Sequence, residues 1–552
     1  MTTSTKVVAG IAVAAVLAAA GLGGWALSTR ARGSGRALAG AGTRGGASGP
    51  AAGTPGSASH GGATTTSPTG TGGGVVVDST GVHANWVTAE NARQGTTAWR
   101  IAGQPPGTIA GFANRVSAHA GDPVTLYVST DASSFQVDAY RMGYYGGAGA
   151  RLVWTSKTVA GVTQPACPVD AGTNMVHCDN WSPSLTFTVT PAFLQGDYLL
   201  KLVGAEGQQS YVTLTVWDPS SHAAYLIKND VYTWQAWNSY GGYDFYAGLG
   251  SCAPTYPPCN RARVVSFDRP YLPGNGSADF LYNEYPLVRL AEQEGLDVAY
   301  ATDLDVEEHP QMVLQHRVLL SLGHDECWSY HERLAAQAAE KQGVNMVFFG
   351  ASPVLRHVRM QPSPLGPGRE EVDYRDSGAD PLDGHGNPLE VTGNTWSSPP
   401  ANWSEVPFVG EGYSGYVLPG GQAVPLVVAD GSAWIYKGTG LSTGSQVPGL
   451  LISDFDQVVG GDHPSNLQIL AHSPMPKGEI ETQSPAPYSD MTYYTDPVSH
   501  AGVFDTGTVA WIPDIPAHPE VQKMTINLLA LFGRGPAGDV QPSVPNWQRW
   551  YS

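Results

Sequence analysis

The feature that most constrains the fold of this chain is a short apolar run at residues 319–322. The run stops at Gly323, and the next three residues are His324, Asp325 and Glu326. An apolar run of this length that ends at a turn residue is typical of a buried strand in a parallel sheet. Open α/β sheets bind their ligands just beyond the carboxyl ends of such strands. We therefore expect three ionisable side chains at the position where such a sheet places its chemistry.

Strand and helix patterns alternate through the second half of the chain. The predicted strands are 225–227, 297–301, 318–322 and 344–349, and the predicted helices are 281–295, 332–342 and 519–532. Alternation at this spacing predicts βαβ units and a doubly wound parallel sheet. The predicted α/β domain spans residues 218–536, includes a Gly- and Pro-rich insertion at 360–515, and is followed by a tail at 537–552.

An all-β pattern precedes this region. Four segments in which apolar residues alternate or nearly alternate are separated by turn residues, at 124–128, 185–189, 198–202 and 211–216. Such a series without helical periodicity is typical of an antiparallel β-sandwich. We therefore predict an Ig-like sandwich domain over residues 79–217, ahead of the α/β domain.

The N-terminus indicates export. Residues 7–27 contain no charge and are rich in Ala, Val and Leu, and three arginines follow by position 36. About 20 apolar residues can cross a bilayer, so residues 1–32 are either an uncleaved membrane anchor or a cleaved signal peptide. Residues 33–78 are mostly Gly, Ser, Thr, Ala and Pro and are predicted to be a flexible linker. Both alternatives place the folded part outside the cytoplasm, either membrane-anchored or secreted.

The charge of the chain argues against one class of partner. The formal net charge is −18, and no basic cluster occurs beyond the N-terminus. Because contact with phosphate requires clustered Lys and Arg, nucleic-acid binding is not expected. Only 14% of the residues are charged, whereas 68 are Gly and 42 are Pro, which favours loop-rich β structure over helical bundles.

The cysteine spacing agrees with export. Cys167 and Cys178 are 11 residues apart, and Cys252 and Cys259 are 7 apart. Both pairs are expected to close short disulfide loops, which are common in exported proteins, although buried free thiols would also fit. Neither spacing matches a zinc site. Cys327 is left over.

Three clusters of polar side chains in the second domain could carry chemistry. They are residues 324–326, a predicted Gly-interrupted loop at 229–246 with four tyrosines and two tryptophans, and the strand-like segment 452–456, which ends in paired carboxylates. Carboxylate and phenolate oxygens suit a hard ion such as ferric iron better than zinc, and water bound to such an ion becomes a nucleophile. Each cluster also has a structural explanation, as a hydrogen-bonded pair, an aromatic packing or sugar-stacking surface, or a turn.

Eight motifs resemble a known series. In chain order they are Trp234–Asn238 with Gly241, Gly242 and Tyr246, then Ser266–Tyr271, Glu284–Leu290, Tyr300–Asp305, Gly323–Ser329, Gly343–Ala351, Asp490–Tyr494 and Gly502–Thr508. Together they resemble the C-terminal domain of the N,N-dimethylformamidase large (beta) subunit family. The resemblance covers residues 222–535 and is far more specific than any one motif.

The resemblance implies a glutamine-amidotransferase-like α/β fold and a mononuclear iron, held by two tyrosines and a glutamate, that hydrolyses a small amide. Glu326 matches the glutamate ligand, and Tyr246 is one expected tyrosine ligand. The family usually has a tyrosine where this chain has Trp237, and an indole cannot ligate a metal in this way. Three alternatives follow: Tyr240 is the second tyrosine ligand, which is the assignment we make, Tyr232 takes that place, or the site lacks a full ligand set.

The resemblance also covers two residues near the ligands, and we expect both to handle protons, since histidine is suited to this near neutral pH. His324 matches a histidine two residues before the glutamate ligand, and Asp454 matches an acid that acts as general base. Cys327 stands where the family usually has a tyrosine. A thiol that follows a strand could act as a nucleophile, but Cys327 lacks a glycine-flanked elbow and an identifiable base.

Two functions from different classes remain open. The first is an exported iron-dependent amidase-like hydrolase, with Glu326, Tyr246 and Tyr240 as ligands and His324 and Asp454 as proton-transfer groups. The alternative is a catalytically inactive surface module on the same fold that binds carbohydrate or cell wall. The expected partners are a small amide substrate, the membrane through the N-terminal segment, and either further copies of the chain or a small partner subunit.

Overall fold

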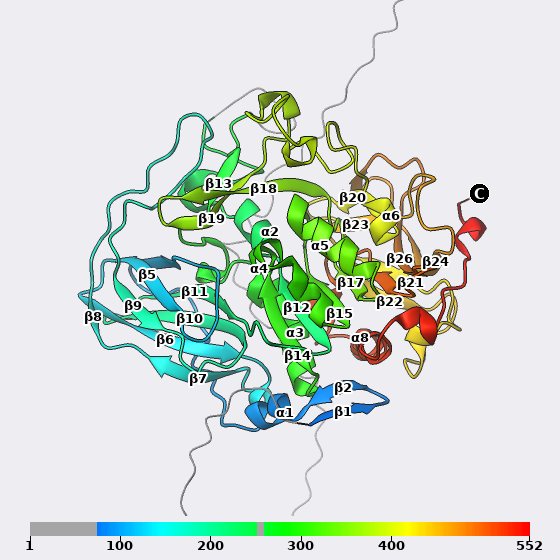
Figure 1. Ribbon diagram of the computed structural model, residues 1–552, viewed down its shortest axis with the longest axis horizontal. Coiled ribbons are helices and arrows are strands. Elements are labelled where there is room, and N and C mark those ends of the chain that lie inside the picture. Colours follow the sequence, from blue (N-terminus) through cyan, green and yellow to red (C-terminus); the bar gives the residue numbers. More distant parts are fainter. Residues whose placement is uncertain (1–73, 251–258, 552) are drawn as a thin grey trace, which may run out of the picture. The chain divides into compact units, whose positions relative to one another are not determined.

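The computed structural model describes residues 74–250 and 259–551 (Figure 1). They form a mixed α/β structure with many strands in several sheets and few helices. The predicted anchor or signal segment, nearly all of the predicted linker, and Cys252 lie outside the described residues. Within the described ranges, no helix is long and apolar enough to span a membrane.

The largest sheet has seven strands in the order β14-β12-β15-β17-β27-β26-β24. The first five are parallel to one another, whereas β26 and β24 run antiparallel to their neighbours. The bounds are β12 (Tyr225–Asn229), β14 (Val298–Thr302), β15 (Val318–Leu322), β17 (Asn345–Phe349), β24 (Gln468–Pro474), β26 (Tyr488–Thr495) and β27 (Gly502–Asp505). The chain passes from β12 to β14 on one side and then to β15 on the other. The strand order therefore reverses between β12 and β15, which is where open α/β sheets bind ligands.

Both faces of this sheet are buried, because successive residues of each parallel strand belong to different hydrophobic cores. In β15, Leu320 belongs to one core and Leu319 to the other. Helices α3 (Tyr285–Gln293) and α8 (Pro519–Phe532) contribute to the first core, and α5 (Tyr330–Glu340) contributes to the second. A sheet covered on both faces requires strands that are apolar throughout, which explains the continuous apolar runs in the sequence.

Two β-sheets precede this sheet in the chain. One has the order β4-β11-β10-β6-β7, with β8 also paired to β6, and the other has the order β3-β5-β9. Their bounds are β3 (Ile109–Ala113), β4 (Ser117–Ala118), β5 (Pro123–Thr130), β6 (Ser134–Met142), β7 (Ala150–Thr155), β8 (Val159–Ala160), β9 (Leu185–Thr188), β10 (Gly196–Gly204) and β11 (Gln209–Val216). Apolar residues of both sheets share one core. All described residues belong to one compact unit, so the division into two domains stays a prediction.

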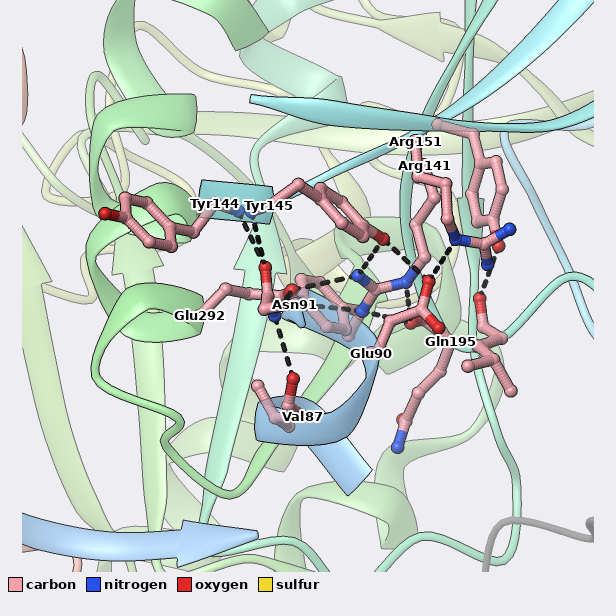
Figure 2. A network of polar contacts seen from close by, with 12 residues as sticks. Val87, Glu90, Asn91, Arg141, Tyr144, Tyr145, Arg151, Gln195 and Glu292 are labelled. Carbon is pink, nitrogen blue, oxygen red and sulfur yellow. Dashed lines mark hydrogen bonds and ion pairs between the residues drawn. The ribbon is translucent and has the colours of Figure 1, made fainter. Parts of the chain in front are cut away.

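A buried polar network joins these β-sheets to α3 (Figure 2). The guanidinium of Arg141 on β6 contacts both carboxylate oxygens of Glu292 on α3, at 2.5 and 2.9 Å. Asn91, at the end of α1 (Asn85–Asn91), donates to Glu292 at 2.6 Å and accepts a hydrogen bond from the backbone N–H of Tyr145 at 3.0 Å. Because a buried charge is tolerated only when it is paired, the network holds α1, β6 and α3 in one arrangement.

Four small sheets complete the described structure, with the orders β1-β2, β13-β19-β18-β16, β23-β20-β25 and β21-β22. Their bounds are β1 (Val75–Asp78), β2 (Gly81–Ala84), β13 (Val264–Ser266), β16 (Cys327–Ser329), β18 (Arg356–Ser363), β19 (Gly366–Val372), β20 (Gly412–Val417), β21 (Val424–Val427), β22 (Gln446–Leu451), β23 (Asp454–Gln457) and β25 (Ile480–Thr482). The remaining α-helices are α2 (Val231–Ala236), α4 (Asp303–Glu308), α6 (Val406–Val409) and α7 (Trp511–Asp514). Strand β16 follows residues 324–326 directly, and β23 begins with Asp454.

Several sequence predictions can be compared with these elements. The disulfide between Cys167 and Cys178 is confirmed. The predicted helix at 281–295 is divided into a π-helical turn, Phe280–Glu284, and α3, whose second residue is Pro286. Proline has no backbone N–H to continue a preceding helix and is favoured in a first turn, so a new helix begins there. The segment 229–246 was predicted as a loop but contains α2.

Candidate active site

Two chain segments meet at the reversal between β12 and β15. The first follows β12, runs through α2 to Trp237, and continues to Tyr246. The second follows β15 and contains His324 and Glu326. Contacts between Glu326 and both aromatic side chains join the segments. The strand order of the sheet therefore explains why residues about 80 positions apart form one cluster.

The buried carboxylate of Glu326 is contacted from several sides. Its Oε1 accepts a hydrogen bond from Nε1 of Trp237 at 2.9 Å and another from the hydroxyl of Tyr246. Its Oε2 lies 3.7 Å from Nε of Arg356 and 3.9 Å from Nε2 of His324. The backbone N–H of Arg356 also donates to the carbonyl of Glu326 at 2.7 Å. Donors and positive charges thus hold the carboxylate in one orientation.

The two aromatic donors are stacked. The rings of Trp237 and Tyr246 have centroids 3.6 Å apart and an interplanar angle of 8°, and Cζ of Arg375 lies 4.3 Å from the centre of the Tyr246 ring. Burial, together with the charge of Glu326, raises the pKa of Tyr246 well above its usual value, against the opposing effect of Arg375. The phenol therefore stays protonated and acts as a donor to Glu326.

His324 lies between carboxylates. Its Nε2 is 3.4 Å from Oδ2 of Asp454, and its side chain is 10% exposed, whereas the Asp454 side chain is 19% exposed. Burial lowers the pKa of His324, but the charges of Glu326, Asp454 and Asp279 outweigh that effect and raise it to about 9. At neutral pH, His324 therefore carries a proton on the nitrogen that faces Asp454.

Two serines beside Asp454 have a left-handed backbone conformation. Ser453 has a φ of 63° and Ser352 a φ of 55°. Oγ of Ser352 donates to Oδ2 of Asp454 at 3.1 Å, and the backbone N–H of Ser352 donates to Oδ2 of Asp456 at 2.7 Å. A non-glycine residue in a sparsely populated backbone region costs about 1–3 kcal/mol, and such residues cluster at functional sites.

The turns after β15 and β17 require glycine. A Cβ placed on Gly350 would lie 1.7 Å from the carbonyl oxygen of Gly323, so any side chain at position 350 would displace the turn that carries His324. Gly323 itself has a φ of 59°, which favours glycine. The glycines that end these strands in the sequence therefore determine the close approach of the two turns.

A cavity of about 420 Å³ adjoins the cluster. Arg356, which contacts Glu326, lines it, as do residues 413–415 of β20. Strand β20 pairs with β23, and Tyr416 on β20 lies opposite Asp454. The other polar residues that line the cavity are mainly uncharged, namely Asn394, Thr395, Ser414, Thr482, Gln483 and Ser484. Glu481 adds a carboxylate. Arg356 and β20 thus connect the cavity to Glu326 and to the strand that carries Asp454, whereas none of His324, Glu326 and Asp454 lines it.

The structure places the other candidate residues elsewhere. Tyr240 packs against a separate aromatic cluster that includes Cys178 and Trp181. Tyr232 is buried, and the pKa of its hydroxyl is raised mainly by burial and by the carboxylates of Glu307, Glu332, Asp303 and Glu371. Cys327 is fully buried, and burial raises the pKa of its thiol, which disfavours the nucleophilic thiolate. Of the predicted residues, His324, Glu326, Tyr246 and Asp454 come together.

The residues present do not fit an iron held by two tyrosines and a glutamate. Glu326 and Tyr246 supply two oxygens, but the third group at this carboxylate is the indole N–H of Trp237, which is a donor and has no lone pair to offer a metal. Within residues 74–250 and 259–551, no three His, Cys, Asp or Glu side chains are arranged to hold a metal ion.

Sequence reasoning missed three contributors to the site. Arg356, Ser352 and Asp279 reach Glu326, Asp454 and His324 from segments that carry no metal-ligand spacing. Position 352 follows the predicted strand 344–349 closely, and residues after parallel strands gather at one edge of a sheet, so Ser352 could have been included on that ground. No local signal indicated Arg356 or Asp279.

Known proteins resemble this chain in two ways, through a family model and through solved structures. Residues 136–523 match the family model described as N,N-dimethylformamidase beta subunit-like, C-terminal. None of the curated proteins matches significantly.

Among solved structures, murine CEACAM1b is similar over 22% of this chain and 63% of its own, with 14% identity and a TM-score of 0.11. A Paenibacillus cycloisomaltooligosaccharide glucanotransferase complexed with cycloisomaltoheptaose is similar over 50% of this chain and 35% of its own, with 10% identity and a TM-score of 0.14. This chain thus spans less than two thirds of either protein. The family match covers well over half of this chain, and the chain belongs to the N,N-dimethylformamidase beta subunit-like family.

Proposed function

We propose that this protein is an amide hydrolase in which His324 and Asp454 carry out acid–base chemistry next to the Glu326 carboxylate. The observation that supports this most directly is the 3.4 Å contact between Nε2 of His324 and Oδ2 of Asp454, next to the Glu326 carboxylate that Arg356 of the cavity lining contacts. Family membership supports a relationship to dimethylformamidases. The reaction itself and its substrate are our proposal.

The proposed reaction assigns one role to each polar group. Asp454 removes a proton from a water molecule, whose oxygen attacks the amide carbonyl carbon, and His324 donates its Nε2 proton to the amide nitrogen as the C–N bond breaks. Glu326 does not attack the substrate. It is held by Trp237 and Tyr246 and keeps His324 positively charged through their 3.9 Å contact. One water is consumed, and a carboxylic acid and an amine are released.

The cavity suggests which amides would be accepted. A volume of about 420 Å³ lies in the range of pockets that bury drug-sized ligands and far exceeds the needs of dimethylformamide. Its surface is mainly apolar, with hydroxyl and amide side chains among the lining residues, which suits a largely apolar substituent that carries an uncharged hydrogen-bonding group. We therefore propose an amide with a neutral, hydrogen-bonding substituent in place of the small amide expected from the sequence.

The remaining assignments extend this proposal. They include an Ig-like sandwich at 79–217 ahead of a glutamine-amidotransferase-like domain at 218–536, and export to the outside of the cytoplasm with a membrane anchor or after secretion. They also include self-association or a small partner subunit. The central sheet supports the glutamine-amidotransferase-like domain, because its five parallel strands carry helices on both faces. The Cys167–Cys178 disulfide supports an oxidising compartment.

The test uses the full chain and a panel of amides from dimethylformamide to amides of amino sugars and dipeptides. Amine release is expected for the polar amides, and His324→Ala and Asp454→Asn are each expected to reduce kcat by about 100-fold or more, because general acid–base groups contribute 10²–10⁴-fold. His385→Ala is the control, since His385 is exposed. Hydrolysis of no amide, or equal activity in all three variants, would contradict the proposal.

The cavity also supports a second candidate, the non-catalytic binding module. Its uncharged polar lining could bind a sugar without any reaction, and Trp237 stands in place of a metal-ligating tyrosine. Saturable binding of an oligosaccharide that His324→Ala leaves unchanged, with no amine release from any amide, would favour this function over hydrolysis.

A further inference from the structure

The turn that follows β15 presents its three ionisable residues on two opposite sides. His324 and Glu326 contact the active-site groups, whereas Asp325, between them, contacts none of those groups. Instead, its Oδ2 lies 2.7 Å from Nζ of Lys228 and accepts a hydrogen bond from Oγ of Ser321 at 2.6 Å. An orientation fixed at Asp325 therefore determines which way both of its neighbours face.

Lys228 is the centre of a fully buried charge cluster. It lies on β12, where it is the register partner of Ser321 on β15, and its ammonium contacts three carboxylates. These are Asp303 on α4, Asp325, and Glu332 on α5 at 2.8 Å. An ammonium has three donors, so each carboxylate can receive one. The ring of Trp328, 4.4 Å from Nζ, covers the ammonium from a further side.

The backbone of the turn is fixed by the same arrangement. The carbonyl of Asp325 accepts hydrogen bonds from Nε1 of Trp328 at 3.0 Å and from the backbone N–H of Val354 at 3.3 Å. Trp328 therefore contacts both the carbonyl of Asp325 and the ammonium that holds its carboxylate. With the Asp325 side chain held on this side, the adjacent residues project to the other side, toward Trp237 and Asp454.

Burial makes this arrangement sensitive to the charge of Lys228. Burial alone would lower the pKa of Lys228, but Asp303, Asp325 and Glu332 together raise it well above its usual value, so the lysine stays charged. Without the ammonium, three carboxylates would repel one another in a region of low dielectric constant. Asp325 is the member of the cluster that can relieve this repulsion by turning, because it lies in a turn rather than on a helix.

We propose that Lys228 is a positioning residue for the active site. By holding Asp325 away from the site, it directs His324 and Glu326 into the site, and it touches no substrate itself. The catalytic role of His324 and Glu326 in this inference rests on the proposed function. The way Lys228 holds Asp325 does not depend on any activity.

The test reads the position of Glu326 without an activity assay. In the full chain labelled with ¹⁵N-tryptophan, the indole N–H signal of Trp237 is assigned by its loss in Trp237→Phe. In Asp325→Asn and in Ser321→Ala, exchange of that proton with solvent is expected to become at least about tenfold faster, because its bond to Glu326 is opened more often. If Lys228→Met folds, it is expected to accelerate this exchange further. If it does not fold, Asp325→Asn and Ser321→Ala still test the proposal.

Glu332→Gln is the matched control. It removes one carboxylate from the same Lys228 cluster but lies on α5, outside the turn, so exchange at Trp237 is expected to stay within about twofold of the wild type. Unchanged exchange in folded Asp325→Asn, or an equal acceleration in Glu332→Gln, would overturn the proposal. Failure of the proposed function would be seen separately, as absent hydrolysis in a protein that still shows this pattern of exchange.

Discussion

Nε1 of Trp237 donates a hydrogen bond to Oε1 of Glu326 at 2.9 Å. The hydroxyl of Tyr246 donates to the same oxygen. Two donors therefore converge on one acceptor, at the place where the family resemblance implied that oxygens would converge on a metal. Because the indole of Trp237 donates a hydrogen bond and cannot ligate a metal, this one residue distinguishes an acid–base site from an iron site.

Trp237→Tyr is expected to create an iron site. A tyrosine at this position would add a third oxygen beside Glu326 and Tyr246, and two phenolates with a carboxylate are a ligand set for a hard ion. Iron content near one atom per chain and a phenolate-to-iron absorption band are expected after incubation with iron. Trp237→Phe is the control, since it removes the indole N–H without adding an oxygen. If Trp237→Tyr binds no more iron than Trp237→Phe, the site does not depend on this position.

Tyr246→Phe is expected to destabilise the protein without unfolding it. The substitution removes the hydroxyl that donates to the buried Glu326 carboxylate but keeps the ring that stacks on Trp237. A lost hydrogen bond to a charged acceptor costs about 1.5–3 kcal/mol. Urea unfolding should show this loss. Tyr282→Phe is the control, because Tyr282 is 66% exposed, and a change below about 0.5 kcal/mol is expected there. Equal effects of the two variants would argue against the Glu326 contact.

Arg141→Met is expected to be strongly destabilising. Arg141 and Glu292 are both buried, and removal of one partner leaves an unpaired buried charge, which costs about 3–5 kcal/mol. The free energy of unfolding in urea is the measurement, and Arg141→Met combined with Glu292→Leu should recover part of the loss. Arg93→Met is the control, because the Arg93 side chain is 56% exposed and its buried partner Glu90 keeps its contact with Nε of Arg151, so a much smaller loss is expected. A loss in Arg141→Met no larger than in the control would show that the network of Figure 2 contributes little.

The contribution of two buried histidines to stability is expected to be lost as the pH decreases from about 6.5 to 4. Burial lowers the pKa of both His316 and His357 to about 4 in the folded protein, whereas an unfolded histidine titrates near 6.5. Between these values the unfolded state binds more protons, so each group's contribution is fully present above pH 6.5 and is lost toward pH 4, by about 3 kcal/mol per group at most.

The variants for this test are His316→Asn and His357→Gln, because an amide can replace the donors to the carbonyls of Ala223 and Leu389. The difference in unfolding free energy between wild type and variant should shrink or change sign as the pH falls through this range. A difference that does not depend on pH would contradict the assignment. His385→Gln is expected to show no pH-dependent difference, since His385 is exposed.

The sequence by itself determined the local elements of the site region. The apolar run that ends at Gly323 predicted β15 and the position of His324 and Glu326 after it, because a strand buried on both faces must be apolar throughout. The ordered motifs predicted the family, which the match over residues 136–523 confirms. The Cys167–Cys178 spacing predicted the disulfide, since a short loop brings the two thiols together.

Only the tertiary structure decided which of several similar side chains reach the site. Tyr240 and Tyr246 lie in one aromatic segment, yet Tyr246 contacts Glu326 and Tyr240 packs in another cluster. Asp325 lies between two active-site residues but faces Lys228. These outcomes depend on strand order, burial and pairings between residues far apart in the chain. Such pairings leave no periodic trace in the residues themselves, because each depends on a partner supplied by another element.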